Sequence, residues 1–116
     1  IQSAPPPPLA QMVLKQAAVL GCQFNFETLH AVQSGDNSME DSKLLHELDI
    51  LVAQDILLLE EEEESNRTLR TYTFRNSLMQ EVTYGLMPFS QRQQLHRAAA
   101  EFVEKRDAVN VEPSLP

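Results

Sequence analysis

The chain has 116 residues, which is enough for one hydrophobic core and too few for two. Apolar residues make up 42%, aromatic residues only 6%, and tryptophan is absent, so we expect a mainly helical core of Leu, Val, Ala and Met. There is no secretory signal and no apolar run near the roughly 18 residues of a membrane span, and the single cysteine, Cys22, excludes an internal disulfide. These features favour a cytoplasmic location without membrane contact.

Charge is unevenly placed along the chain, whose formal net charge is −8. Residues 1–65 carry two basic residues, Lys15 and Lys43, against twelve acidic ones, a balance of −10. Residues 66–116 carry seven basic residues against five acidic ones, a balance of +2. The N-terminal half is therefore a poor candidate for binding the phosphates of DNA.

The first eight residues form a proline-rich segment that ends in four consecutive prolines. We interpret residues 1–8 as a stiff linker, and the alternative is a docking motif for a small proline-binding module. Because the chain opens with Ile1 and both ends are rich in proline, we expect it to be a domain of a longer protein.

The first predicted helix covers about Leu9–Leu20 and stops at Gly21. Residues at helical spacing give it one apolar face, which consists of Leu9, Met12, Val13, Ala17 and Leu20. Asn25, between Phe24 and Phe26, is a suitable N-cap for a short second helix through Val32.

A turn-rich loop is predicted over Ser34–Ser42, followed by a third helix over about Lys43–Ala53. The third helix carries a wide apolar stripe that consists of Leu44, Leu45, Leu48, Leu51 and Val52. The short apolar run Ile56–Leu59 indicates a strand, and the alternation toward Phe74 indicates a return strand over Thr68–Phe74. The hairpin tip between them is expected to consist of Glu60–Glu64 with Ser65, Asn66 and Arg67.

Three helices followed by a two-stranded hairpin is the order of a winged helix. We therefore predict a mainly α chain, with a winged-helix domain over residues 9–74, the glutamate run as its wing, and two appended C-terminal helices. The alternative is a helical bundle in which residues 56–59 merely extend the third helix.

Residues 75–106 are predicted to be a helical extension that leads into following helical repeats, and residues 107–116 a linker or tail. The first appended helix has apolar residues at helical spacing, namely Leu78, Met79, Val82 and Leu86, and it ends near Gly85 and Pro88. Ser77 and Gln80 have the spacing of a capping box, and Asn76 is a competing N-cap. The last helix covers Ser90–Lys105, and its expected apolar face consists of Leu95, Ala99, Phe102 and Val103.

No catalytic constellation emerges from the residue types that usually carry chemistry. The three histidines, His30, His46 and His96, lie on different predicted helices without a recurring metal-ligand spacing, so surface or packing roles are expected. Cys22 lacks a basic neighbour that would lower its pKa, and we interpret it as a small, partly buried side chain. Three glycines do not suffice for a phosphate-binding loop. We therefore expect no catalytic residue, no metal site and no cofactor in this chain.

Acidic residues dominate both surfaces with which a winged helix would meet DNA. The third helix and its flanks carry Lys43 against four acids, which are Asp41, Glu47, Asp49 and Asp55, and the wing adds five glutamates. The glutamate run is expected to be solvated, although a divalent-cation site is the alternative. We expect no DNA binding.

The remaining basic residues, Arg75, Arg92 and Arg97, admit two interpretations. They can form surface pairs with acids of the two appended helices, namely Glu81, Glu101 and Glu104. Alternatively they form a small positive face for an acidic partner or a nucleotide phosphate.

One family pattern is visible in the C-terminal half, Phe74-Arg75-x-x-Leu78-x-Gln80-Glu81-Val82-x-Tyr84 and then Leu86-x-Pro88-x-x-x-Arg92-x-x-Leu95-His96-x-x-x-Ala100-Glu101. This pattern resembles the segment after the ATPase core of STAND-class signalling NTPases, most closely those fused to class III (soluble-type) adenylyl cyclases. The stretch from Leu14 to Leu29 is similar to the first winged-helix segment of the same proteins. The resemblance covers about residues 12–104.

The resemblance implies a non-catalytic regulatory module. In such NTPases the winged helix packs on the nucleotide-binding domain, closes it in the ADP state and swings away on activation. ATP or ADP would then sit in that neighbouring domain, and the partners of this module would be the nucleotide-binding domain and the helical repeats of the same chain. An alternative is a module that docks a separate protein subunit.

A histidine just after the hairpin often senses ADP in this family, and the matching position here is Asn76. Asparagine can donate a hydrogen bond but carries no charge, so a structural N-cap is the simpler role. The interdomain or nucleotide-proximal candidates implied by the matched motif are Arg75, Asn76, Gln80, Tyr84, Arg92 and His96.

Overall fold

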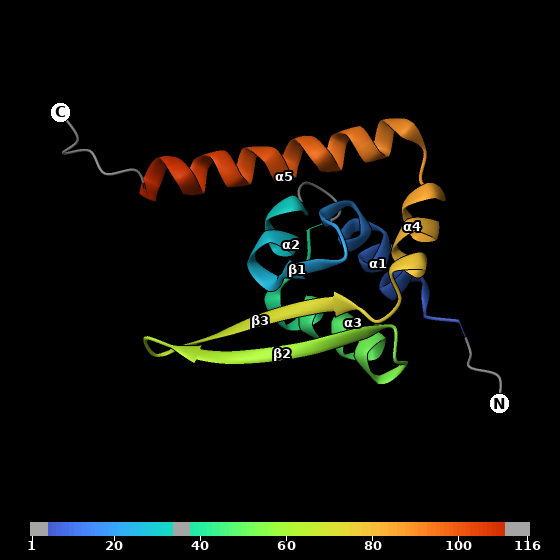
Figure 1. Ribbon diagram of the computed structural model, residues 1–116, viewed down its shortest axis with the longest axis horizontal. Coiled ribbons are helices and arrows are strands. Elements are labelled where there is room, and N and C mark those ends of the chain that lie inside the picture. The colour runs from blue at the N-terminus through green and yellow to red at the C-terminus, as the bar shows by residue number, and fades with distance from the viewer. Residues whose placement is uncertain (1–4, 34–37, 111–116) are drawn as a thin grey trace.

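The computed structural model describes residues 5–33 and 38–110, with side chains described up to residue 105. This part of the chain contains five helices and three strands (Figure 1), which are α1 (Pro8–Leu20), β1 (Gln23–Asn25), α2 (Phe26–Val32), α3 (Asp41–Ala53), β2 (Leu57–Glu64), β3 (Arg67–Phe74), α4 (Ser77–Gly85) and α5 (Phe89–Asn110). The strands form one antiparallel sheet in the order β1-β3-β2. The expectation of a mainly helical chain with a hairpin is confirmed, but the sheet has three strands and not two.

Helix α1 lies at the centre of the fold, where it contacts α2, α3, α4, α5 and β1. Pro8 begins the helix, at a position where its missing N–H costs no hydrogen bond. Seven of its residues are buried, which are Ala10, Val13, Leu14, Gln16, Ala17, Ala18 and Val19. They lie around most of the helix and not on the single predicted face, and Leu9, which was expected in that face, is 41% exposed.

The third strand, β1, is the element that the sequence did not indicate. Its three residues pair with β3 in the register Gln23↔Thr73, Phe24↔Tyr72 and Asn25↔Thr71. Phe24 is buried and stacks on Tyr72, with ring centroids 5.6 Å apart. Gly21 has a φ of 112°, which a residue with a side chain adopts only with strain, and it lets the chain turn from α1 into β1. Three residues are too few for an alternating pattern to be visible.

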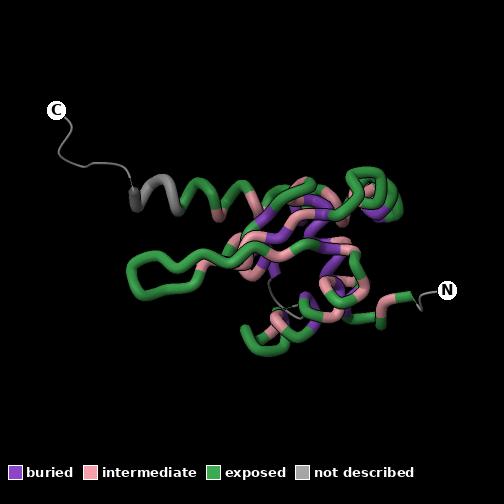
Figure 2. The backbone as a smooth tube through the Cα atoms, turned by 60° about the horizontal axis from the view of Figure 1, so that its bottom comes forward, coloured by how far each residue is buried: buried purple, intermediate pink, exposed green. Residues whose placement is uncertain are grey.

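The glutamate run was expected at the hairpin tip, and this prediction is wrong. Glu60–Glu64 belong to β2, which pairs with β3 along its whole length from Leu57↔Phe74 to Glu64↔Arg67. The tip is instead the two residues Ser65 and Asn66, whose φ values of 49° and 69° suit a tight two-residue turn. The hairpin extends well beyond α1, α2, α3 and α4 (Figure 1) and is exposed at its far end (Figure 2).

Cross-strand partners explain how five glutamates join a strand that they intrinsically disfavour. Glu61 pairs with Arg70 at 3.0 Å, and Glu63 accepts a hydrogen bond from the Thr68 hydroxyl at 3.3 Å. The strand β2 also lies at the sheet edge, where exposed charges guard against pairing with another chain.

The predicted second and third helices are confirmed with small shifts at their ends. The Asn25 side chain caps α2 by accepting a hydrogen bond from the Thr28 backbone at 2.8 Å, as its position predicts. Helix α3 begins at Asp41, so the predicted loop is two residues shorter at its C-terminal end, and its positions 34–37 lie outside the described residues. In the predicted stripe of α3, Leu44, Leu48 and Leu51 are buried in the core.

Helix α5 lies across α1 and α2 on the side of the fold away from the hairpin (Figure 1). Leu95 is its one buried residue among those whose side chains are described, while Ala98 and Ala99 pack against the core less completely. The helix runs to Asn110, so positions 107–110 of the predicted tail are helical; positions 1–4 of the leader and 111–116 of the tail lie outside the described residues. None of the helices in the described part of the chain combines the length and the apolarity needed to cross a membrane.

Tyr72 is fully buried on β3, and its hydroxyl has no hydrogen-bond partner. Burial raises the pKa of Tyr72 from 10.0 to about 12, with nearby Arg70 opposing the shift. Because the unfolded chain ionises this tyrosine first, we expect the free energy of unfolding to fall between pH 10 and pH 12, by about 1.4 kcal/mol per pH unit.

Urea titrations at several pH values test this expectation. In Tyr72→Phe the free energy of unfolding should fall less steeply between pH 10 and pH 12. At pH 7 the variant should be at least as stable as the unsubstituted chain, because no unpaired hydroxyl remains buried. Tyr84→Phe, which leaves Tyr72 in place, is the matched control and should keep the decline. An unchanged slope in Tyr72→Phe would contradict the assignment.

Candidate protein-docking surface

The six candidate residues fall into three places, all on or next to α4. Arg75 and Asn76 lie at the N-terminal end of α4 and line a recess of about 550 Å³ together with Asp55 and Met79. Gln80 faces α1. The remaining three, Tyr84, Arg92 and His96, meet at the corner between α4 and α5.

Asn76 is the N-cap of α4, as one of the two sequence interpretations proposed. Its side-chain oxygen accepts a hydrogen bond from the Leu78 backbone N–H at 2.8 Å. The competing capping box is wrong, because the Gln80 amide donates to the Ala18 carbonyl at 2.6 Å and does not reach back to the start of its own helix. The side-chain oxygen of Asn76 is therefore already engaged in a hydrogen bond within its own chain.

The contact of Gln80 fastens α4 to the end of α1, across 62 positions of sequence. The thiol of Cys22 lies beside it, with its sulfur 3.8 Å from the Gln80 side-chain oxygen. Cys22 is exposed, so its predicted role as a partly buried filler is wrong. Sequence reasoning could not foresee this tether, because both partners depend on how α1 and α4 pack.

The corner between α4 and α5 is held by polar contacts of aromatic groups. The Tyr84 hydroxyl and the His96 Nε2 atom lie 2.8 Å apart. The Arg92 guanidinium lies over the Tyr84 ring at 4.9 Å from its centroid and near the Phe89 ring at 6.0 Å. Such cation–π contacts contribute roughly 0.5–1 kcal/mol at exposed positions. Three of the predicted residues are thus brought together, at the opposite end of α4 from the Arg75 recess.

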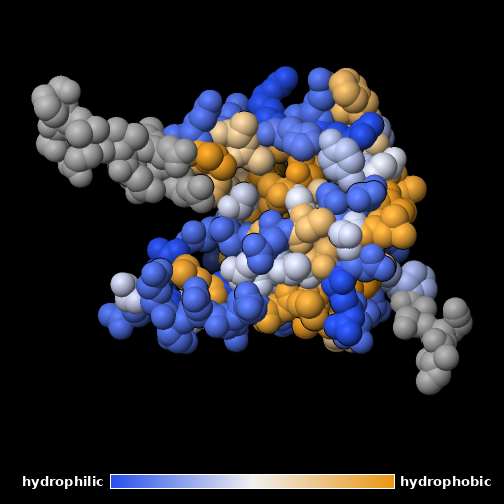
Figure 3. Space-filling view, in the orientation of Figure 1, coloured by the Kyte–Doolittle hydropathy of each residue, from blue (hydrophilic) through white to orange (hydrophobic). Residues whose placement is uncertain are grey.

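Helix α4 turns its apolar side chains away from the core. Leu78, Val82 and Leu86 are spaced by four residues and are 61%, 54% and 68% exposed. Met79 is 38% exposed on the same side, and Phe89 at the start of α5 is 66% exposed. We call these five residues the α4 surface. Apolar colour gathers along the edge of the molecule where α4 lies (Figures 1 and 3).

The inner side of α4 is less apolar than its outer side. Thr83 is its buried residue, and Met87 just beyond the helix is buried as well. Five of the eight exposed large apolar residues among the described positions belong to the α4 surface. Scattered exposed apolar residues are ordinary, whereas contiguous exposed apolar residues are typical of interaction sites.

The apolar period that predicted α4 was correct, but it did not reveal which way the helix faces. The sequence carried no signal of the outward orientation, because the other positions of the helix, which include Gln80, Glu81 and Thr83, are polar. That is the pattern expected of a helix that packs its apolar row on the core.

The arginines near the α4 surface are not matched by carboxylates. In the described part of the chain the ion pairs are His30–Asp41, Lys43–Glu47, Arg67–Glu27 and Arg70–Glu61. The predicted surface pairs of Arg75, Arg92 and Arg97 with acids of α4 and α5 are therefore not formed. Glu81 is exposed on α4 and is the acidic residue of that helix.

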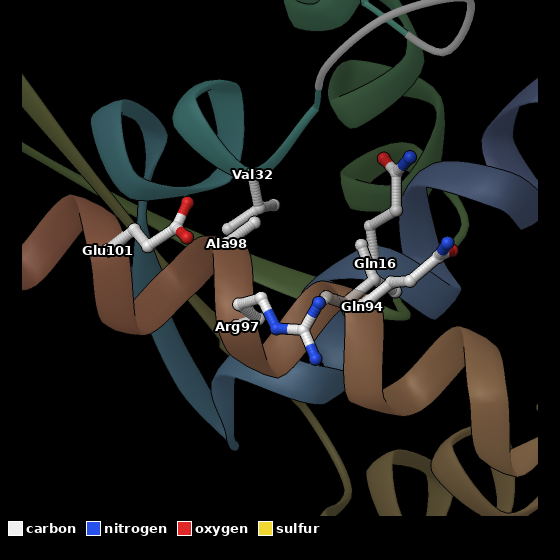
Figure 4. A pocket seen from close by; sticks show the side chains of 7 residues that line it. Gln16, Val32, Gln94, Arg97, Ala98 and Glu101 are labelled. Atoms are coloured by element: carbon white, nitrogen blue, oxygen red, sulfur yellow. The ribbon is translucent and has the colours of Figure 1, made fainter.

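A second hollow lies between α5 and the pair α1 and α2. It has a volume of about 370 Å³ and is lined by Gln16, Val32, Gln94, Leu95, Arg97, Ala98 and Glu101 (Figure 4). The buried Gln16 accepts a hydrogen bond from Gln33 at 2.8 Å, so this amide is engaged within the fold. Of the other histidines, His30 lies 3.2 Å from the Met39 carbonyl, and the described residues contain no cluster of three or more metal-binding side chains.

The N-cap of α4 can be tested with two neighbouring substitutions. Asn76→Ala removes the acceptor for the Leu78 N–H and should lower the free energy of unfolding by about 1 kcal/mol. Ser77→Ala, the matched control, should change it by less than about 0.5 kcal/mol, as surface substitutions usually do. Thermal and urea unfolding measure both. A larger loss for Ser77→Ala than for Asn76→Ala would contradict the cap.

We found no family model, no curated protein and no solved structure that matches this chain.

Proposed function

We propose that this chain is a non-catalytic regulatory module that packs on another domain through the α4 surface. The observation that carries the proposal is the row of Leu78, Val82 and Leu86, each more than half exposed on one side of a well-capped helix. An apolar row of this kind is expected to be covered in the working protein, because leaving it in water loses the stabilisation that burial gives.

The fold proposed for the module is a winged helix. Helices α1, α2 and α3 come first, and the β2–β3 hairpin follows as the wing, with β1 added beside β3. The appended α4 and α5 would then be the route by which the module joins following helical repeats. This order supports the resemblance to STAND-class NTPases that the motif around Arg75 and Tyr84 suggests.

In that setting the domain against which α4 packs is the nucleotide-binding domain of the same protein, and the effector is of the class III adenylyl cyclase type. The Arg75 recess at the start of α4 would lie next to the docked face, because Met79 belongs to both the recess and the α4 surface. Arg75 is then the residue that could meet a phosphate. Asn76 is the weaker candidate, since its oxygen already caps α4.

DNA binding is not part of the proposal. The exposed acids of α3 include Asp41 and Asp49, and the exposed far part of β2 consists of glutamates. Glu47, which the sequence counted among the groups facing DNA, is instead buried and pairs with Lys43 at 3.5 Å. Both surfaces still carry net negative charge toward a phosphate backbone.

Hydrogen exchange on the full-length protein tests the regulatory role. We expect peptides from residues 72–105 to exchange more slowly with ADP than with an ATP analogue, because the α4 surface is covered only in the closed state. Peptides from α3, buried in the core in either state, are the internal control. Equal protection of residues 72–105 in both states would remove nucleotide coupling from the proposal.

A separate protein subunit is the second candidate occupant, and the same exposed row supports it. Val82→Glu in the full-length protein should weaken either kind of docking, whereas Leu58→Glu, an exposed apolar residue on β2, should not. Cross-linking from residues near α4 then separates the two cases. Links within one chain support the interdomain role, and links to another chain support the subunit role.

A further inference from the structure

The shape of the α4 surface suits another helix. Leu78, Val82 and Leu86 recur every four residues and form a ridge, which spans about 12 Å along the helix axis. Ridges of this spacing pack into the grooves of a neighbouring helix, and the contact between helices is made in this way in most helical folds. Met79 and Phe89 flank the ridge and would widen the contact at its two ends.

Unmatched positive charge lies at both ends of this ridge. Arg75 shares a recess with Met79 at the N-terminal end. Arg92 lies 6.0 Å from the Phe89 ring at the other end. No described carboxylate forms an ion pair with either arginine, although Asp55 lines the Arg75 recess and Glu81 is exposed on α4. The N-terminal end of α4 adds the partial positive charge of the helix dipole beside Arg75.

We infer that the α4 surface binds an amphipathic helix whose apolar face is bordered by carboxylates. The apolar residues of that helix pack on the ridge, and its Asp or Glu side chains reach Arg75 at one end and Arg92 at the other. This inference rests on the proposed docking role of α4 and adds the chemical class of the surface that docks. Charge at the margins of such a contact selects the partner more than it strengthens binding.

Designed peptides provide the probe. Two labelled peptides of about 18 residues, long enough to hold a helix in water, carry the same leucine face and differ only in flanking Glu or Lys. Fluorescence anisotropy with the 116-residue chain should show the Glu peptide binding about tenfold more tightly than the Lys peptide at low salt, with the difference shrinking as salt screens the charges.

Substitutions in the chain locate the binding and supply matched controls. Arg75→Gln should weaken the Glu peptide by about fivefold and leave the Lys peptide unchanged or tighter. Arg97→Gln, an exposed arginine at the other hollow, should change neither peptide. Val82→Glu should abolish binding of the Glu peptide. Circular dichroism confirms that each variant remains folded.

Three outcomes overturn the inference. The first is binding of the Lys peptide as tight as that of the Glu peptide, the second is a loss with Arg97→Gln equal to that with Arg75→Gln, and the third is no binding of either peptide. Each leaves the proposed function standing if hydrogen exchange of the full-length protein still depends on nucleotide. If hydrogen exchange does not depend on nucleotide but the Glu peptide still binds selectively, the inference about the α4 surface is supported and the regulatory role is contradicted.

Discussion

Burial of α1 sets the positions of the elements around it. Its buried residues lie on most sides of the helix, so it needs neighbours all around it, and α2, α3, α4 and α5 supply them together with β1. Ala10, Ala17 and Ala18 let these neighbours approach closely because their side chains are short. The position of α4 follows from this arrangement, since the Gln80 amide can reach the Ala18 carbonyl only where α1 ends.

Helix α4 is held in the fold without burying its row of large apolar side chains. Its inner side uses Thr83, a tether from Gln80 and the partly buried ring of Tyr84, and none of the three belongs to the exposed row. The cap of Asn76 and the contacts of Tyr84 with Arg92 and His96 hold both ends of the helix without help from its outer row. A helix fixed in this way can present a preformed ridge, and little ordering entropy is then lost when a partner binds.

Charge is separated between the two extremities of the molecule. The projecting hairpin carries five consecutive glutamates on an edge strand, which discourages both strand pairing and phosphate binding. The α4 surface lies on the opposite side (Figure 1) and has arginines at its margins. An acidic partner would be repelled by the first region and attracted by the second, which favours one orientation of approach.

The helices and the hairpin could be predicted from the amino-acid sequence, because periodicity, caps and turn residues are local properties. Asn25 and Asn76 were identifiable as N-caps, and the stripe containing Leu44, Leu48 and Leu51 predicted its own burial. Local signals gave the wrong prediction where pairing with another strand determined the structure. The glutamates of β2 became a strand because β3 offered Arg70 and Thr68 opposite them.

The sequence did not predict which faces of these elements are covered. The three-residue strand β1 exists because β3 has a free edge for it, and α1 is buried on most sides because five elements surround it. The outward row of α4 has the same helical period whether it faces the core or water, so its period could not reveal its exposure. Which side of a helix is buried depends on elements distant in the sequence, and for that reason the candidate surface emerged only from the folded chain.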